Sequence, residues 1–258
     1  MEKPIITYSE NRIGHIVLNR PEKKNALNAE MVSSLKTAIE AFAEDDGVQI
    51  IILSANGDVF CSGADLASLQ AMQQNTFEQN LKDSQHLKSL FLKIYTMPKL
   101  VIASIQGHAL AGGCGLATVC DFAFSVPEAK FGYTEVKIGF VPAIVMVFLL
   151  RKIGEAKTRE LLIQARLLTA CQAVDYGLIH EVVTKELLEK TVKDFANKLI
   201  QSNSSQAMGM TKQMLAQMPE KNLAEALDYA AAMNAKARAT SDCKRGINAF
   251  LNKEQITW

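Results

Sequence analysis

The alternation of strand-like and helical patterns in the first half of the chain most constrains its fold. Three runs rich in β-branched and aliphatic residues predict strands: 13–18, 48–54 and 100–105. Between the first two, residues 29–44 place apolar side chains on one helical face, and Asn28 is a suitable N-cap. A second helix is predicted over 77–95, and short strands over 121–126 and 130–133. This mixture predicts an α/β domain.

After Pro142 the pattern becomes helical. Pro142 suits the first position of a helix that runs through Lys152 and ends at Gly154. Thr169 is expected to cap a short helix closed by Gly177, before a strand over 179–183. Beyond Thr184 nearly everything is helical, without a flexible linker or an exact repeat.

Composition excludes several classes of function. The chain of 258 residues is 48% apolar and 21% charged, with a net charge of +1, so neither a nucleic-acid surface nor a membrane surface is indicated. The five cysteines form no CxxC pair or metal-binding spacing: Cys61, Cys114, Cys120, Cys171 and Cys243. They are expected to be reduced and to bind no metal, and the protein is expected to be cytoplasmic.

Three segments contain residues suited to catalysis. Residues 60–66 (FCSGADL) follow a predicted strand. Several of their side chains are small, which allows a ligand to come close to the backbone. Residues 106–117 (QGHALAGGCGLA) place glycines at a helix start, where N–H groups are free. Tight helix packing explains these glycines equally well, and neither phosphate-loop glycine pattern is matched. Residues 129–139 (AKFGYTEVKIG) hold Glu135 in an apolar context; it is either a buried proton carrier or a surface glutamate paired with a lysine.

Taken together, these segments resemble the enoyl-CoA hydratase/isomerase (crotonase) family in order and spacing. The resemblance covers nearly the whole chain and is carried by residues 19–27, 62–66, 111–113, 120–121, 131–132 with Glu135, and 243–253. It implies a spiral of ββα turns over 1–198, which binds acyl-CoA, and a helical region over 199–258 that builds a homotrimer or hexamer.

The resemblance also implies roles for individual residues. The N–H groups of Ala64 and Gly112 would form an oxyanion hole for the thioester oxygen, while Glu135 moves a proton. The coenzyme A end of the substrate would be lined by Lys23, Lys24, Ala26, Ser62, Asp65 and Leu66. No separate cofactor is expected, since coenzyme A would be part of the substrate. The acyl pocket would be lined by Gly113, Gly115, Pro142 and Ala143.

One position departs from the family pattern. Hydratases of this family usually carry a second glutamate where this chain has Gly115. The missing side chain is expected to leave room for a branched acyl group, and residues 135–144 resemble the methylglutaconyl-CoA hydratases. We therefore favour hydration of a 2-enoyl-CoA, with double-bond isomerisation by a single glutamate as the alternative. Decarboxylation of an acyl thioester, RNA binding and a catalytically inactive scaffold are the remaining alternatives. Acyl chain identity, and coenzyme A versus a carrier protein, stay open.

Overall fold

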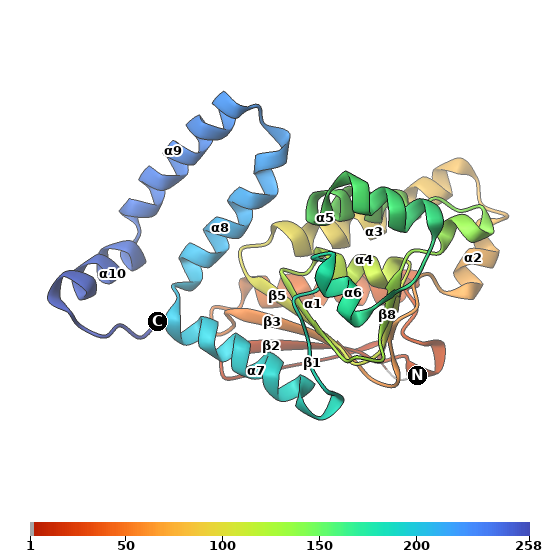
Figure 1. The fold of residues 1–258 in the computed structure, drawn as a ribbon, viewed down its shortest axis with the longest axis horizontal. Helices are drawn as coiled ribbons and strands as arrows, with labels where there is room; N and C mark the ends of the chain where they lie inside the picture. Colours follow the sequence, from red (N-terminus) through yellow and green to blue (C-terminus); the bar gives the residue numbers. More distant parts are fainter. Residues whose placement is uncertain (1–2) are drawn as a thin grey trace.

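Two β-sheets form the centre of the protein, whose computed structural model describes residues 3–258 (Figure 1). The larger sheet has six strands in spatial order: β1 (Ile5–Glu10), β2 (Ile13–Leu18), β3 (Ile50–Ala55), β5 (Leu100–Ile105), β7 (Phe122–Ser125) and β10 (Glu181–Val182). Only β1 and β2 are antiparallel, and the other neighbours run parallel. The parallel strands β3 and β5 are almost wholly buried, because helices cover both faces of the sheet.

The smaller sheet is built from short strands. Its order is β4 (Val59–Cys61), β6 (His108–Leu110), β8 (Lys130–Gly132) and β9 (Leu168–Thr169). The first three are parallel, and β9 runs antiparallel to β8. Sequence patterns predicted β8 to within one residue but gave no strand for β4, β6 or β9.

Helices pack around both sheets. They are α1 (Ala29–Glu44), α2 (Leu66–Met72), α3 (Phe77–Thr96), α4 (Gly112–Val119), α5 (Ala143–Gln164), α6 (Ala170–Asp175), α7 (Lys185–Ser202), α8 (Ser205–Gln217), α9 (Leu223–Ala239) and α10 (Ser241–Asn252). Short 3₁₀ turns occur at η1 (Pro21–Lys23), η2 (Glu135–Ile138) and η3 (Met218–Glu220). Within residues 3–258, none of these helices combines the length and apolar character that a membrane span requires.

Local sequence signals explain several helix boundaries. The Asn28 side chain accepts a hydrogen bond from the N–H of Met31, which makes it the N-cap predicted for α1. Thr169 and Gln172 form a capping box at the start of α6. Gly154 interrupts α5 with φ +77°, so the first helical stretch ends where predicted. Pro142 is the N-cap of α5 rather than its first helical residue.

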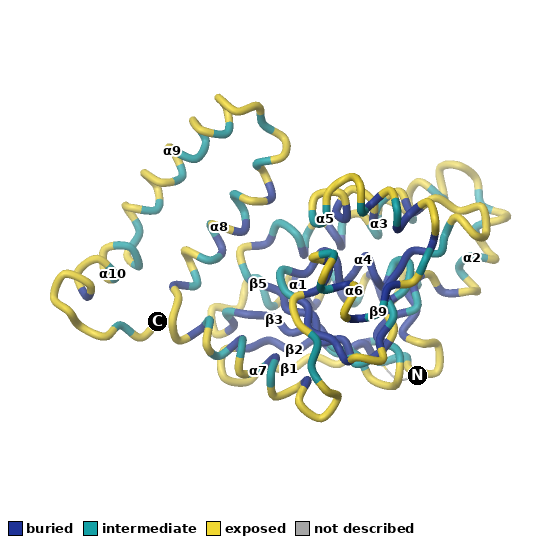
Figure 2. The backbone as a smooth tube through the Cα atoms, in the orientation of Figure 1, coloured by how far each residue is buried: buried dark blue, intermediate teal, exposed yellow. Residues whose placement is uncertain are grey.

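The last three helices extend from the sheets as an arm, residues 203–258 (Figure 1). Their surfaces are mostly exposed or half-buried, in contrast to the sheets (Figure 2). The predicted α/β class with a helical C-terminal region is therefore confirmed. However, α7 contacts β3, β5 and β7 and continues to Ser202, so the predicted boundary after residue 198 falls inside this helix.

Candidate active site

The three segments singled out from the sequence follow three neighbouring parallel strands of the smaller sheet. Residues 62–65 follow β4, Ala111 follows β6, and residues 133–135 follow β8. Strand β6 lies in the middle and pairs with β4 on one side and β8 on the other. The carboxyl ends of parallel strands meet at one edge of a sheet, which brings the three segments together there.

Two backbone N–H groups are free at this edge. Leu27 donates its N–H to the Gly63 carbonyl (2.7 Å), and its carbonyl accepts from the Asp65 N–H (3.0 Å). These bonds use both neighbours of Ala64, so the Ala64 N–H points away from Leu27. Gly112 is the first residue of α4, where a helix offers no internal acceptor. Neither N–H donates to a backbone carbonyl within residues 3–258.

Close backbone packing brings these two donors near each other. A Cβ on Gly63 would stand 2.8 Å from the Cβ of Ala111 and 3.2 Å from the nitrogen of Gly112. Gly63 also has φ +92°, so only glycine meets both demands. Ala111 itself adopts φ +49° and ψ −125°, and its N–H is fixed by the Gly132 carbonyl at 2.8 Å. Such backbone strain concentrates at functional sites.

Glu135 lies three residues after the end of β8, in the third of these segments. Its side chain is half-buried, and its Oε2 atom is buried without a hydrogen-bond partner within residues 3–258. Burial raises the pKa of Glu135, although backbone N–H groups of Thr134 and of Glu135 itself act in the opposite direction. A desolvated carboxyl group with raised pKa is suited to proton transfer near neutral pH.

Comparison with known proteins identifies the family of the chain. A family model described as enoyl-CoA hydratase/isomerase matches residues 8–258. The chain belongs to this family.

Individual relatives cover the chain from end to end. A Thermus thermophilus protein is 37% identical over 249 residues, 96% of this chain and 98% of that protein. The crotonyl-CoA hydratase of Syntrophomonas wolfei is 33% identical over 257 residues, 98% of this chain and 97% of its own. The crystal structure of an enoyl-CoA hydratase from Mycobacterium smegmatis superposes with a TM-score of 0.93 at 28% identity, over 100% of this chain and 99% of that one. The predicted family and its fold are thus confirmed.

In this crotonase-family chain, the expected room beside Gly115 is absent. A Cβ on Gly115 would stand 3.2 Å from the Cβ of Val145, closer still to its Cγ1, and 3.1 Å from Cε2 of Phe91. Two apolar side chains therefore fill the space, and the prediction of an enlarged pocket there is wrong. Sequence reasoning could not find Val145, because only tertiary packing brings α5 against α4.

The other predicted pocket residues differ in their surroundings. A Cβ on Gly113 would stand 2.6 Å from the carbonyl carbon of Cys61, so Gly113 is needed for α4 to approach β4. Its Cα therefore faces the sheet rather than an open pocket. Pro142 is buried and Ala143 is exposed at the start of α5.

The residues predicted for the coenzyme A end lie along two adjoining segments. Lys23 and Lys24 are exposed, and the Lys24 carbonyl accepts the N–H of Ser62 at 3.1 Å. Ala26 is buried, whereas Leu66 is 82% exposed.

Asp65, predicted to line the coenzyme A end, makes two structural contacts. Its Oδ1 atom caps α2 by accepting the Ala67 N–H at 3.0 Å, and its Oδ2 atom accepts from Arg20 at 3.1 Å. Arg20 also donates to the Ala26 carbonyl, at 3.1 Å. The side chain of Asp65 is thus occupied in holding the two segments together. Arg20 had no predicted role, although it lies within the motif 19–27.

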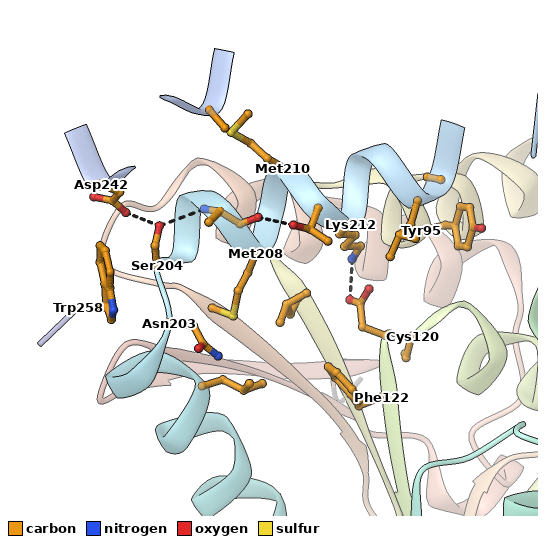
Figure 3. A pocket seen from close by; sticks show the side chains of 18 of the residues that line it. Tyr95, Cys120, Phe122, Asn203, Ser204, Met208, Met210, Lys212, Asp242 and Trp258 are labelled. Atoms are coloured by element: carbon orange, nitrogen blue, oxygen red, sulfur yellow. Dashed lines mark hydrogen bonds and ion pairs between the residues drawn. The ribbon is translucent and has the colours of Figure 1, made fainter. Parts of the chain in front are cut away.

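A large cavity lies elsewhere within residues 3–258. It measures about 950 Å³ and lies between the arm and the sheets, lined by Tyr95, Phe122, Met208, Lys212 and Trp258 among others (Figure 3). Lys212 of α8 crosses it to pair with Asp121 at 2.7 Å. None of the predicted site residues lines this cavity.

Proposed function

We propose that the protein adds water to a 2-enoyl-CoA thioester. The carrying observation is the juxtaposition of two unpartnered N–H groups, at Ala64 and Gly112, with the segment that bears desolvated Glu135. The thioester oxygen accepts hydrogen bonds from both N–H groups. These donors stabilise the negative charge that develops on the oxygen as the substrate becomes an enolate.

Glu135 enters the reaction as a carboxylate. It removes a proton from water while the resulting hydroxide forms a bond to C3, and the C2=C3 electron pair moves toward the thioester oxygen. The same carboxyl group then returns its proton to C2. The net change is addition of H and OH across the double bond, with Glu135 regenerated and no metal or separate cofactor consumed.

Coenzyme A forms part of the substrate in this proposal. The exposed ammonium groups of Lys23 and Lys24 supply positive charge for its phosphates. The backbone of Ala26, Ser62 and Leu66 lines the rest of the coenzyme A site. Asp65 holds the two segments of this site together through its bond with Arg20.

Double-bond isomerisation is the second candidate, and the filled space beside Gly115 favours it. Gly115 itself supplies no carboxylate to share the water with Glu135, and the atoms nearest to it belong to Val145 and Phe91. Isomerisation needs one carboxylate only: Glu135 would remove a proton from C2 of a 3-enoyl-CoA to form a dienolate on the same two N–H donors. It would then return the proton to C4 as the double bond moves from C3=C4 to C2=C3.

We propose a branched acyl group for the substrate, such as 3-methylglutaconyl. Its support is the likeness of residues 135–144 to the methylglutaconyl-CoA hydratases. The space beside Gly115 gives it none, because Val145 and Phe91 fill that space.

The assembly proposed for this enzyme is a homotrimer or two trimers paired. The arm supports it, since its helices expose large apolar side chains: Leu215, Leu223, Leu227, Ile247, Phe250 and Leu251. Apolar patches of this kind mark protein–protein contacts in soluble proteins.

A panel of thioesters tests these proposals together. The enzyme is incubated with crotonyl-CoA, a linear 3-enoyl-CoA and 3-methylglutaconyl-CoA, and the products are identified by mass and chromatography. A gain of one water on a 2-enoyl-CoA supports hydration. Conversion of the 3-enoyl to the 2-enoyl thioester without gain of mass supports isomerisation instead, and no change of any thioester contradicts both.

A further inference from the structure

Helix α4 carries one of the two oxyanion donors, yet its own sequence stabilises it poorly. Three of its eight residues are glycine, at 112, 113 and 115, and its N-cap Ala111 offers no side-chain acceptor. Glycine is a weak helix former. Better helix formers cannot replace Gly113 or Gly115, because each Cβ would collide with a neighbour. The order of this helix must come from contacts with other elements.

The C-terminal end of α4 is held by an ammonium group from α5. Lys152 Nζ donates to the carbonyls of Thr118 and Cys120, at 2.9 Å each. The last carbonyls of a helix lack internal donors, and a cation there interacts favourably with the helix dipole. Burial lowers the pKa of Lys152, with Cys120 and Asp121 acting in the opposite direction. Removing an ammonium group from water costs free energy, which hydrogen bonds of good geometry offset.

Helix α4 is short, so a displacement of one end is transmitted to the other. Eight residues span about 12 Å, with the Gly112 N–H at one end and the Lys152 contacts at the other. A tilt of the C-terminal end therefore moves the donor. The Thr118 hydroxyl adds a second attachment, since it donates to the Cys114 carbonyl (2.8 Å) and meets the Tyr133 hydroxyl (2.8 Å).

We propose that Lys152 is a positioning residue of the oxyanion hole, which aims the Gly112 N–H by fixing the far end of α4. The inference rests on the proposed thioester site and extends it to a residue that does not touch substrate. Lys212 provides a matched control. It is a buried lysine of the same region, but it donates to Asp121 and to the Lys99 carbonyl and makes no bond to a carbonyl of α4.

The direct readout is polarisation of a bound thioester carbonyl. Crotonyl-CoA labelled with ¹³C at that carbonyl is bound to Glu135→Gln, in which turnover is blocked, and its stretching frequency is measured by isotope-edited infrared spectroscopy. Binding is expected to lower the frequency. Adding Lys152→Met should reduce this downshift, whereas adding Lys212→Met should leave it unchanged.

Turnover gives an independent readout in the chain with Glu135 intact. Lys152→Met is expected to lower kcat about 10- to 100-fold with little change in KM, because a displacement of the donor below 1 Å suffices for such a loss. Lys152→Arg keeps both the charge and the donors, so it should restore most of kcat. If Lys152→Met does not fold, Lys152→Gln, which keeps an amide donor, takes its place in both measurements.

A full carbonyl downshift in Glu135→Gln with Lys152→Met would overturn the role of Lys152 while leaving the oxyanion hole intact. An equal reduction with Lys212→Met would also overturn it, as a general effect of destabilisation. Absence of any downshift in Glu135→Gln alone would instead overturn the proposed oxyanion hole, and this inference with it.

Discussion

The side chain of Val145 occupies the space into which a side chain on Gly115 would point. Its Cβ lies 3.2 Å from the ideal Cβ position, and its Cγ1 lies closer. Gly115→Ala should therefore destabilise the protein by about 1–3 kcal/mol, the usual cost of overpacking, despite the better helix propensity of alanine. Chemical denaturation measures the change. In Gly115→Ala/Val145→Ala the two effects should fall short of their sum, and strict additivity would contradict this packing.

Gly115→Glu should behave worse than Gly115→Ala, since a longer side chain meets the same obstruction by Val145 and Phe91. We expect no gain in crotonyl-CoA hydration from this change alone. Combined with Val145→Ala, it should recover part of the lost stability, measured by thermal unfolding. A stable Gly115→Glu single variant with raised activity would show that Val145 moves aside readily.

Glu135→Gln should remove turnover by about 10²–10⁴-fold while thioester affinity is retained, because only the proton-transfer group is lost. The variant should also be more stable than the wild type at neutral pH. The folded-state pKa of Glu135 is raised, so its contribution to stability is present below the unfolded-state pKa and is lost as pH rises through the folded-state value. Calorimetry and steady-state rates test both parts. Glu128→Gln, at an exposed acidic residue, is the control and should change neither.

The pH profile should show the same carboxyl group. Because Glu135 enters the reaction ionised and its pKa is raised by burial, kcat/KM should fall as pH drops through a value above about 4.3, the ordinary glutamate pKa. Profiles of the wild type and of Glu128→Gln should coincide. An acid limb at or below the ordinary value would assign the proton transfer to another group.

Asp65→Ala removes a helix cap and an ion pair with Arg20 at once. Loss of a cap typically costs about 1 kcal/mol. Because Asp65 joins the two segments at the coenzyme A end, KM for the thioester should rise more than kcat falls. Arg20→Met removes the ion pair but keeps the cap, so it should show a smaller rise in KM. A similar loss of kcat in both variants, with KM unchanged, would contradict this role.

Assembly through the arm predicts a solution mass of three chains, or a multiple of three, by light scattering. Leu223→Lys/Leu227→Lys should lower that mass, because both side chains lie exposed on α9, at 78% and 62%. Leu187→Lys, at a 52% exposed position of α7, serves as the control. A wild-type monomer at working concentration would contradict the proposed assembly.

Much of this protein follows from local sequence. The apolar spacing of α1 and its cap Asn28, the strands β2 and β5, and the break at Gly154 depend on residues near one another in the chain. The motifs around Ala64, Gly112 and Glu135 were enough to identify the family, because their order and spacing are specific even though each motif alone is not.

Tertiary structure alone decided what surrounds those motifs. The parallel pairing of β4, β6 and β8 brings together segments that lie about 20 to 70 residues apart in the chain, and no local pattern predicts this pairing. The filling of the space at Gly115 by Val145, and the hold of Lys152 on α4, depend on how α5 packs against α4. Local propensity determines which residues form a helix, but only packing determines which side chain of one helix meets which backbone of another.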